Sequence, residues 1–163
     1  MATLRRRLRA FRGDQRGVTA LEYALVAPLF FIVLFIGLEV TFMLLADATL
    51  DSATSRIGRM GKIGMFQGAD CHEKVMTELE DVVGFWADTT NLHADAKIYK
   101  PGESIEFEDI DDEDYEPECD VGDRGDMVVF RLGFDKPGLT GVISFLGMDF
   151  FRYERFVVIH NEP

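Results

Sequence analysis

An unbroken apolar run near the N-terminus dominates the hydrophobic pattern of the chain. Residues 23–38 (YALVAPLFFIVLFIGL) contain no charged side chain, and after Glu39 the apolar sequence continues as VTFMLLA. As a helix, residues 23–46 would extend about 36 Å, compared with a bilayer hydrocarbon core of roughly 30 Å. A buried helix of a soluble protein would normally have a polar face, and no polar residue recurs here at helical spacing. We therefore predict a membrane-spanning helix over about residues 23–46.

The same helix is expected to continue beyond the membrane. Small and helix-compatible residues follow up to Arg59, and Gly58, Gly61 and Gly64 are expected to loosen the end of the helix. A rod from Val18 to Arg59 would measure about 63 Å, which is longer than a bilayer requires.

A second, amphipathic helix is predicted over residues 71–87, because apolar positions recur there at helical spacing. These positions are Val75, Leu79, Val82, Val83 and Trp86. Glu73, Glu78 and Glu80 provide a polar side, so we expect the apolar stripe to face the core of the protein.

From Leu92 onward the pattern changes to the two-residue alternation of β-strands. We predict strands over residues 94–100, 127–134 and 150–159, with Pro101-Gly102 ending the first. Residues 139–148 are apolar with two glycines and predict a short helix or a loop lying on the sheet. The predicted fold class is α+β, with a long N-terminal helix and a small antiparallel sheet packed against it.

Charges are distributed unevenly along the chain. The sequence has 17 Lys and Arg residues against 29 Asp and Glu residues, a net charge of −12, so no nucleic-acid partner is expected. Six arginines precede Gly17, whereas the far flank of the apolar run begins with Asp47 and Asp51. Because positive residues stay on the cytoplasmic side of a span, we expect the N-terminus in the cytoplasm and the C-terminal part outside it.

A cleaved secretory signal is an alternative interpretation of the apolar run. Ala46-Asp47-Ala48 imitates the small-x-small pattern of a cleavage site. The run is longer than the 7 to 15 residues typical of such signals, and it contains Glu22 and Glu39.

The start of the apolar run carries a specific motif. Residues 16–23 read RGVTALEY, so that a basic leader is followed by a glycine, four weakly polar or apolar residues, and an acid within the helix. Placing an ionisable group inside a membrane span costs up to about 3 kcal/mol of insertion free energy, so such a group is functional by default. The alternative interpretation is that Glu22 is simply an acid at the membrane boundary of the helix. The motif resembles a type IV prepilin signal of the Tad/Flp kind. In such signals a membrane aspartyl peptidase cuts after the glycine, and the fifth mature residue is Glu, followed by Tyr or Phe.

Carried over to this chain, the resemblance implies that Gly17 precedes the cut and that Val18 is the new N-terminus. Glu22 and Tyr23 are then the signature pair used in processing and assembly. A glycine has no side chain to obstruct the peptidase. The Glu22 carboxylate, four residues along the same helix or on an adjoining subunit, can neutralise the new ammonium group of Val18.

The chain is also similar to TadE-like proteins at both ends. Residues 51–59 read DSATSRIGR, where the family has a sequence of the D-N-A-A-R-x-G-A-R type. The C-terminus reads VVIHNEP, similar to the family ending V-V-x-N-E-P, with His160 where an Arg is common. Residues 99–126 have no counterpart in this resemblance.

The resemblance implies a pilin-like fold and a role as a minor pilin or pseudopilin of a bacterial Tad pilus, acting in priming, assembly or tip formation for adherence. Residues 1–17 would be a cytoplasmic leader that is cleaved, residues 18–60 the long helix, and residues 61–163 a periplasmic domain. The expected location is the bacterial inner membrane, and then the pilus or cell surface. The expected partners are the prepilin peptidase, other pilin and pseudopilin subunits, the Tad assembly platform and membrane lipid.

Residues 103–126 form an acidic segment, with 13 acids and one base, Arg124. Such a run is typical of a solvated loop whose charges repel one another. Clustered carboxylates also suit calcium, for which Asp109, Asp111 and Glu113 are the candidates. These residues lack the glycine and the terminal Glu of an EF-hand, and we expect no cofactor.

The two cysteines, Cys71 and Cys119, both lie on the predicted outer side of the membrane. In an oxidising compartment they are expected to form one disulfide, which would stabilise the fold by about 4 kcal/mol by closing a loop of about 49 residues. A nucleophilic Cys71 activated by His72 is the alternative, but sequence neighbours on a helix rarely face one another.

No catalytic motif is present in the sequence, so we do not predict an enzyme. It has no phosphate-binding glycine loop, no HExxH and no GxSxG. The alternative to a pilin is an uncleaved, single-pass, membrane-anchored extracytoplasmic binding protein.

Overall fold

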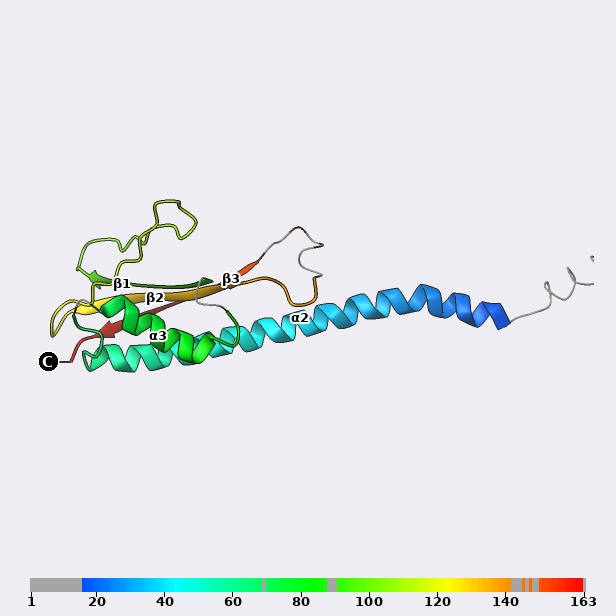
Figure 1. The fold of residues 1–163 in the computed structure, drawn as a ribbon, viewed down its shortest axis with the longest axis horizontal. Coiled ribbons are helices and arrows are strands. Elements are labelled where there is room, and N and C mark those ends of the chain that lie inside the picture. Colours follow the sequence, from blue (N-terminus) through cyan, green and yellow to red (C-terminus); the bar gives the residue numbers. More distant parts are fainter. Residues whose placement is uncertain are drawn as a thin grey trace, which may run out of the picture.

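A long helix carries a small domain on its C-terminal half (Figure 1). The computed structural model describes residues 16–68, 70–87, 91–141, 145, 147 and 150–162. In this part of the chain the helices are α2 (Arg16–Lys62) and α3 (Cys71–Val83). The strands are β1 (Leu92–Tyr99), β2 (Met127–Lys136) and β3 (Phe151–His160). The predicted α+β fold, with a long apolar N-terminal helix and an antiparallel sheet, is confirmed.

Helix α2 is 47 residues long and continues past the predicted end of the membrane span without a break. Its last turn contains Arg59 and Lys62, whose positive charges suit the negative end of the helix dipole. The chain then turns at Gly64, whose φ of +70° is a left-handed conformation that glycine adopts without steric cost.

Gly58 and Gly61 have a different role from the one predicted. Both lie inside regular helix, where β3 packs against α2. A Cβ at Gly58 would lie 3.4 Å from Val157, and a Cβ at Gly61 would overlap the end of the Ile159 side chain. Gly61 therefore allows the sheet to approach the helix closely, whereas Gly58 has room for a methyl group in ordinary contact. Both glycines lie within the helix, so the prediction that they loosen its end was wrong.

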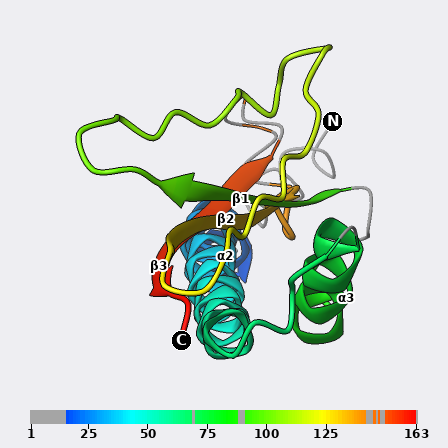
Figure 2. The same cartoon turned by 90° about the vertical axis from the view of Figure 1, so that its left-hand side faces the viewer.

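The sheet is antiparallel, with the strand order β1-β2-β3. Figure 2 shows α2 and α3 on one side of the sheet and the segment between β1 and β2 on the other. The strands match the predicted segments with small shifts at their ends. Helix α3 ends at Val83, four residues before the predicted end, and Gly84 is its C-cap residue.

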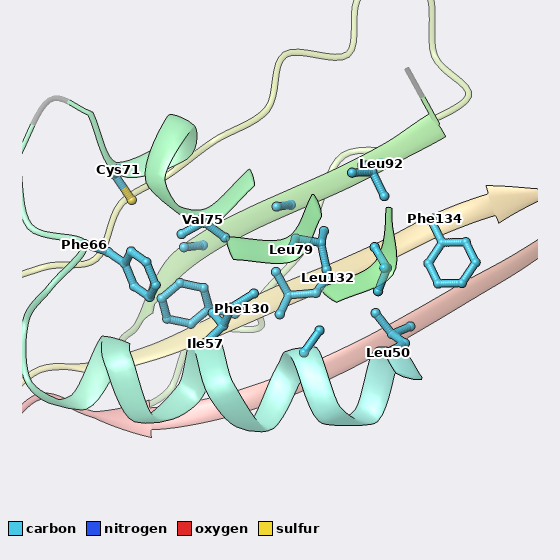
Figure 3. Packing of buried hydrophobic residues seen from close by; sticks show 14 of the residues in the cluster. Leu50, Ile57, Phe66, Cys71, Val75, Leu79, Leu92, Phe130, Leu132 and Phe134 are labelled. Carbon is cyan, nitrogen blue, oxygen red and sulfur yellow. The ribbon is translucent and has the colours of Figure 1, made fainter. Parts of the chain in front are cut away.

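The core lies between the sheet and the two helices (Figure 3). Alternate residues of β2 are fully buried and face the helices: Val128, Phe130, Leu132 and Phe134. They pack against buried residues of α2 and α3, namely Leu50, Ala53, Ile57, Val75, Leu79 and Val83. Burial of each large apolar side chain contributes about 1.5–3 kcal/mol to stability. The apolar stripe predicted for α3 therefore faces the core.

A buried histidine lies on the other face of the sheet. His93 on β1 pairs with Gly133 on β2, and it is 5% exposed. The pKa of His93 is lowered from its ordinary 6.5 to about 4, chiefly by burial; Asp135 opposes this shift and Arg131 adds to it. The imidazole Nε2 lies 3.4 Å from a carboxylate oxygen of Glu154.

Gly133→Ala is expected to destabilise the protein by about 1–3 kcal/mol, because an added Cβ would overlap both the His93 ring and the backbone carbonyl oxygen of Tyr153. Gly58→Ala is the matched control, since its new methyl group makes ordinary contacts and alanine favours the helix. Denaturant unfolding of the full chain in detergent measures both. Equal stabilities for the two variants would contradict this account.

The free energy of unfolding is expected to fall as the pH is lowered from 6.5 to about 4. In this window the unfolded chain binds a proton at His93 that the folded chain does not bind. The corresponding loss is about 3 kcal/mol, reduced to the extent that Glu154 accepts a hydrogen bond from the protonated ring. Unfolding should be compared with that of His93→Gln across this range; parallel pH profiles would rule out the histidine as the cause.

Candidate membrane and assembly site

The N-terminal half of α2 stands apart from the domain (Figure 1). Between residues 17 and 38 every residue is exposed except Ala27, which is half-buried. The large apolar residues on all sides of the helix are exposed, including Leu25 at 72% and Phe30 at 59%. This segment is about 33 Å long, close to the thickness of a bilayer core. Among the described residues, α2 is the one helix long and apolar enough to cross a membrane, as expected of a single membrane anchor.

The predicted processing residues lie at the exposed start of this helix. Gly17 is in the first turn, and a Cβ there would have no atom within 4 Å. Val18 is 54% exposed and Tyr23 74% exposed, and Glu22 is also exposed. Four positions separate Val18 from Glu22, so the two lie one turn apart on the same side of the helix. The structure brings these residues together, while the leader before Arg16 lies outside the described residues.

Glu39 is not a solvated acid at the outer end of the span. Its side chain is buried, and it accepts hydrogen bonds from the connection between β2 and β3. The donors are the N–H of Leu139 at 2.8 Å, the N–H of Thr140 at 2.9 Å and the hydroxyl of Thr140 at 2.7 Å. The acid therefore holds a loop about 100 positions away in the sequence, which local sequence patterns could not reveal.

From Glu39 onward the helix belongs to the domain. Arg155 of β3 donates to both carboxylate oxygens of Asp47 at 2.6 Å and to Asp51 at 3.3 Å. The indole N–H of Trp86 donates to the hydroxyl of Thr49 at 3.0 Å. Asp47 and Asp51, which were predicted to lie on the outer flank of the span, therefore bind Arg155 of the sheet.

An ion pair on the second face of the sheet holds the acidic segment. Arg131 and Asp95 are opposite one another on β2 and β1, buried, with a nitrogen–oxygen distance of 2.6 Å. The Tyr115 hydroxyl and the N–H of Glu118 both donate to Asp95, and Arg131 donates to the carbonyl oxygen of Glu108. Burial and the Asp95 carboxylate raise the pKa of Tyr115. The acidic segment has solvated charges, as predicted, but its backbone is fixed to the sheet.

The three calcium candidates do not converge. Asp109 accepts the N–H of Asp111, and the Asp111 carboxylate binds Arg152 at 2.6 Å. The hydrogen bond from Arg152 lowers the pKa of Asp111. Glu113 is exposed. Across the ranges that the structure describes, no group of three or more His, Cys, Asp or Glu residues is placed to hold a metal ion.

The predicted disulfide between Cys71 and Cys119 is present, with 5.9 Å between the Cα atoms. Cys119 lies beside β1, where Ala96 donates to the carbonyl oxygen of Glu118 and accepts from the N–H of Asp120, each at 2.8 Å. The bond therefore joins the start of α3 to the end of the acidic segment and helps to cover the outer edge of β1.

Reduction of the disulfide is expected to lower the free energy of unfolding by up to about 4 kcal/mol, because it releases a closed loop of about 49 residues in the unfolded chain. The measurement compares denaturant midpoints of the full chain in detergent with and without reductant. A Cys71→Ser, Cys119→Ser double variant is the control, since reductant should not affect it. A thiol assay on denatured, unreduced protein that found two free thiols would refute the bond.

Comparison with known proteins identifies the N-terminal helix. The sequence model of the TadE-like protein family matches residues 17–59. This match covers the exposed half of α2, Glu39 and the part of the helix that packs on the sheet, and it ends before α3. No curated protein and no solved structure gives a significant match to the chain. Over residues 17–59, therefore, the chain is similar to the TadE-like protein family.

Proposed function

We propose that this chain is a minor pilin or pseudopilin of a bacterial Tad pilus, processed by a prepilin peptidase between Gly17 and Val18. The observation that carries the proposal is the exposed apolar half of α2, which lies within the segment matched by the TadE-like family. A helix with apolar side chains all round can be covered first by lipid and later by the helices of other subunits. Assembly of a pilus from the membrane requires that the same helix surface contact lipid first and other subunits later.

We place the helix across the bacterial inner membrane, with the N-terminus in the cytoplasm and the domain in the periplasm. The arginine-rich leader favours this orientation. The Cys71–Cys119 disulfide also favours it, because disulfides persist in oxidising compartments. In this proposal residues 1–17 are the cleaved leader, residues 18–60 the helix and residues 61–163 the periplasmic domain, which is later carried to the pilus or cell surface.

Removal of the leader changes the electrostatics of the N-terminus. The leader's six arginines would hold it to the anionic cytoplasmic leaflet at about 1 kcal/mol each. The cut leaves one ammonium group, on Val18, which Glu22 of the same helix or of an adjoining subunit can neutralise. The mature helix can then leave the membrane more readily than the precursor.

The partners in this proposal are the prepilin peptidase, other pilin and pseudopilin subunits and the Tad assembly platform. The resemblance favours priming, assembly or tip formation over the bulk of the fibre, because major subunits of this kind are far shorter chains. The acidic segment fits such a role, since it presents a charged surface on the face of the sheet opposite α2 (Figure 2).

In cells that contain the peptidase, the intact mass of the chain is expected to correspond to a protein that begins at Val18. Without the peptidase the full mass should remain. An uncut chain in the presence of the peptidase would exclude the pilin and favour an uncleaved, membrane-anchored binding protein.

Glu22→Ala is expected to lower pilus-dependent adherence at least about tenfold, because an unpaired ammonium group in lipid or in a helix bundle costs more than about 1.4 kcal/mol. Glu73→Ala, which removes an exposed acid on α3, is the matched control and should adhere normally. Normal adherence of the Glu22→Ala strain would count against the assembly role of this residue.

A further inference from the structure

We propose that three described residues between β2 and β3, Leu139, Phe145 and Phe150, form a second membrane contact in the bilayer interface on the domain side. Glu39 of α2 holds the start of the connection between the two strands in place. The inference rests on the proposed membrane span of α2 and adds a second point of attachment to it. Four observations support it: composition, position, backbone hydrogen bonding and continuity of the apolar surface.

The composition of the connection differs from that of the rest of the domain. Residues 137–150 read PGLTGVISFLGMDF and contain one charged residue, Asp149. From Asp47 to the C-terminus, by contrast, the chain has 26 acidic and 11 basic residues. Leu139 is 54% exposed, Phe145 89% and Phe150 48%. Large apolar side chains gathered in one exposed segment indicate a surface that something apolar covers.

The position of the connection matches the point where α2 leaves the bilayer. The exposed helical segment before Glu39 is about 33 Å long, against a hydrocarbon core of roughly 30 Å. The bonds from Glu39 fix Leu139 and Thr140 beside the helix at this level. Figure 1 shows the chain after β2 approaching α2 at the end of the domain nearest the exposed half of the helix.

Irregular backbone near lipid needs hydrogen-bond partners for its polar groups, and Glu39 supplies such partners. Its two carboxylate oxygens accept the N–H groups of Leu139 and Thr140, and one of them accepts the Thr140 hydroxyl as well. Hydrogen bonds to an ionised acceptor are stronger than those between neutral groups. Glu39 lies in an otherwise apolar stretch of helix, and both of its carboxylate oxygens accept hydrogen bonds from the loop that it holds.

Lipid is favoured over a second copy of the chain as the covering partner. The exposed apolar surface of α2 continues past Glu39 through Val40, Leu44 and Leu45. Leu139 and Thr140 lie against this same part of the helix, so a bilayer that covers α2 reaches them without a further surface being formed. In the proposed order of events, lipid surrounds α2 before any sister helix does, so lipid is the first apolar partner available to the loop.

The test uses the full chain with a single tryptophan, in a Trp86→Phe background, reconstituted in phosphatidylcholine–phosphatidylglycerol vesicles with brominated acyl chains. The protein density is kept low, so that most vesicles hold no more than one chain. Phe145→Trp is expected to be quenched at least about half as strongly as Leu29→Trp, which lies in the proposed span. Phe156→Trp, at an exposed position on β3, is the control and should not be quenched.

Two results separate this inference from the proposed span. Quenching of Leu29→Trp, with Phe145→Trp no more quenched than Phe156→Trp, overturns the second contact and leaves the span intact. If Leu29→Trp is not quenched either, both are overturned. A Phe145→Trp fluorescence that brominated lipid does not quench, but that shifts to shorter wavelength as the protein density rises, would make a second copy the partner and would also overturn the inference.

The role of Glu39 has its own test in the Phe145→Trp chain. Glu39→Leu is expected to reduce the quenching to the level of Phe156→Trp, because the loop loses the acceptor for two backbone N–H groups. Glu73→Leu is the matched control and should keep full quenching. Unchanged quenching in a Glu39→Leu chain that retains its disulfide and helix content would overturn the role assigned to Glu39.

Discussion

The packing of the inner face of β2 against the C-terminal half of α2 is the interaction on which the rest of the structure depends. Without a helix beside it, the sheet would expose Phe130, Leu132 and Phe134. Within the described part of the chain, α2 and α3 are the helices that cover this face of the sheet. The same helix must remain apolar on all sides at its other end. One continuous helix therefore serves two surroundings, and the transition between them falls close to Glu39, where burial by the domain begins.

Close approach between helix and sheet requires small residues on α2. Ala53, Gly58 and Gly61 are buried where the sheet packs, and β3 places Val157 and Ile159 against the two glycines. Each glycine lowers the intrinsic helix stability by up to about 1 kcal/mol. That cost is offset by the burial of β3 and β2 side chains, each worth more than the loss. The domain that packs on the C-terminal half of α2 thus stabilises this half of the helix.

The helices and strands could be predicted from the sequence because their signals are local. Apolar residues at helical spacing predicted the buried face of α3, alternating apolar and polar residues predicted the strands, and the long apolar run predicted α2. The pairs that organise the site were not predicted, since Asp95 and Arg131 are 36 positions apart and Glu39 and Leu139 are 100 apart. Gly58 and Gly61 were misinterpreted because glycine serves both helix ends and close packing. A usable signal existed for Asp95 and Arg131: opposite charges at interior positions of two predicted strands.

The order of layers, with helices, sheet and acidic segment in succession, separates incompatible surfaces. The acidic segment lies on the face of the sheet opposite α2, held by the Asp95–Arg131 pair and the disulfide (Figure 2). In the proposed assembly, charges on the helix side of the domain would lie beside the apolar helices of other subunits, where burial of unpaired charge is costly. Fixing the acids on the far face keeps them in water at each stage. The buried ion pair therefore keeps the charged segment away from the helical surface that the proposed assembly must bury.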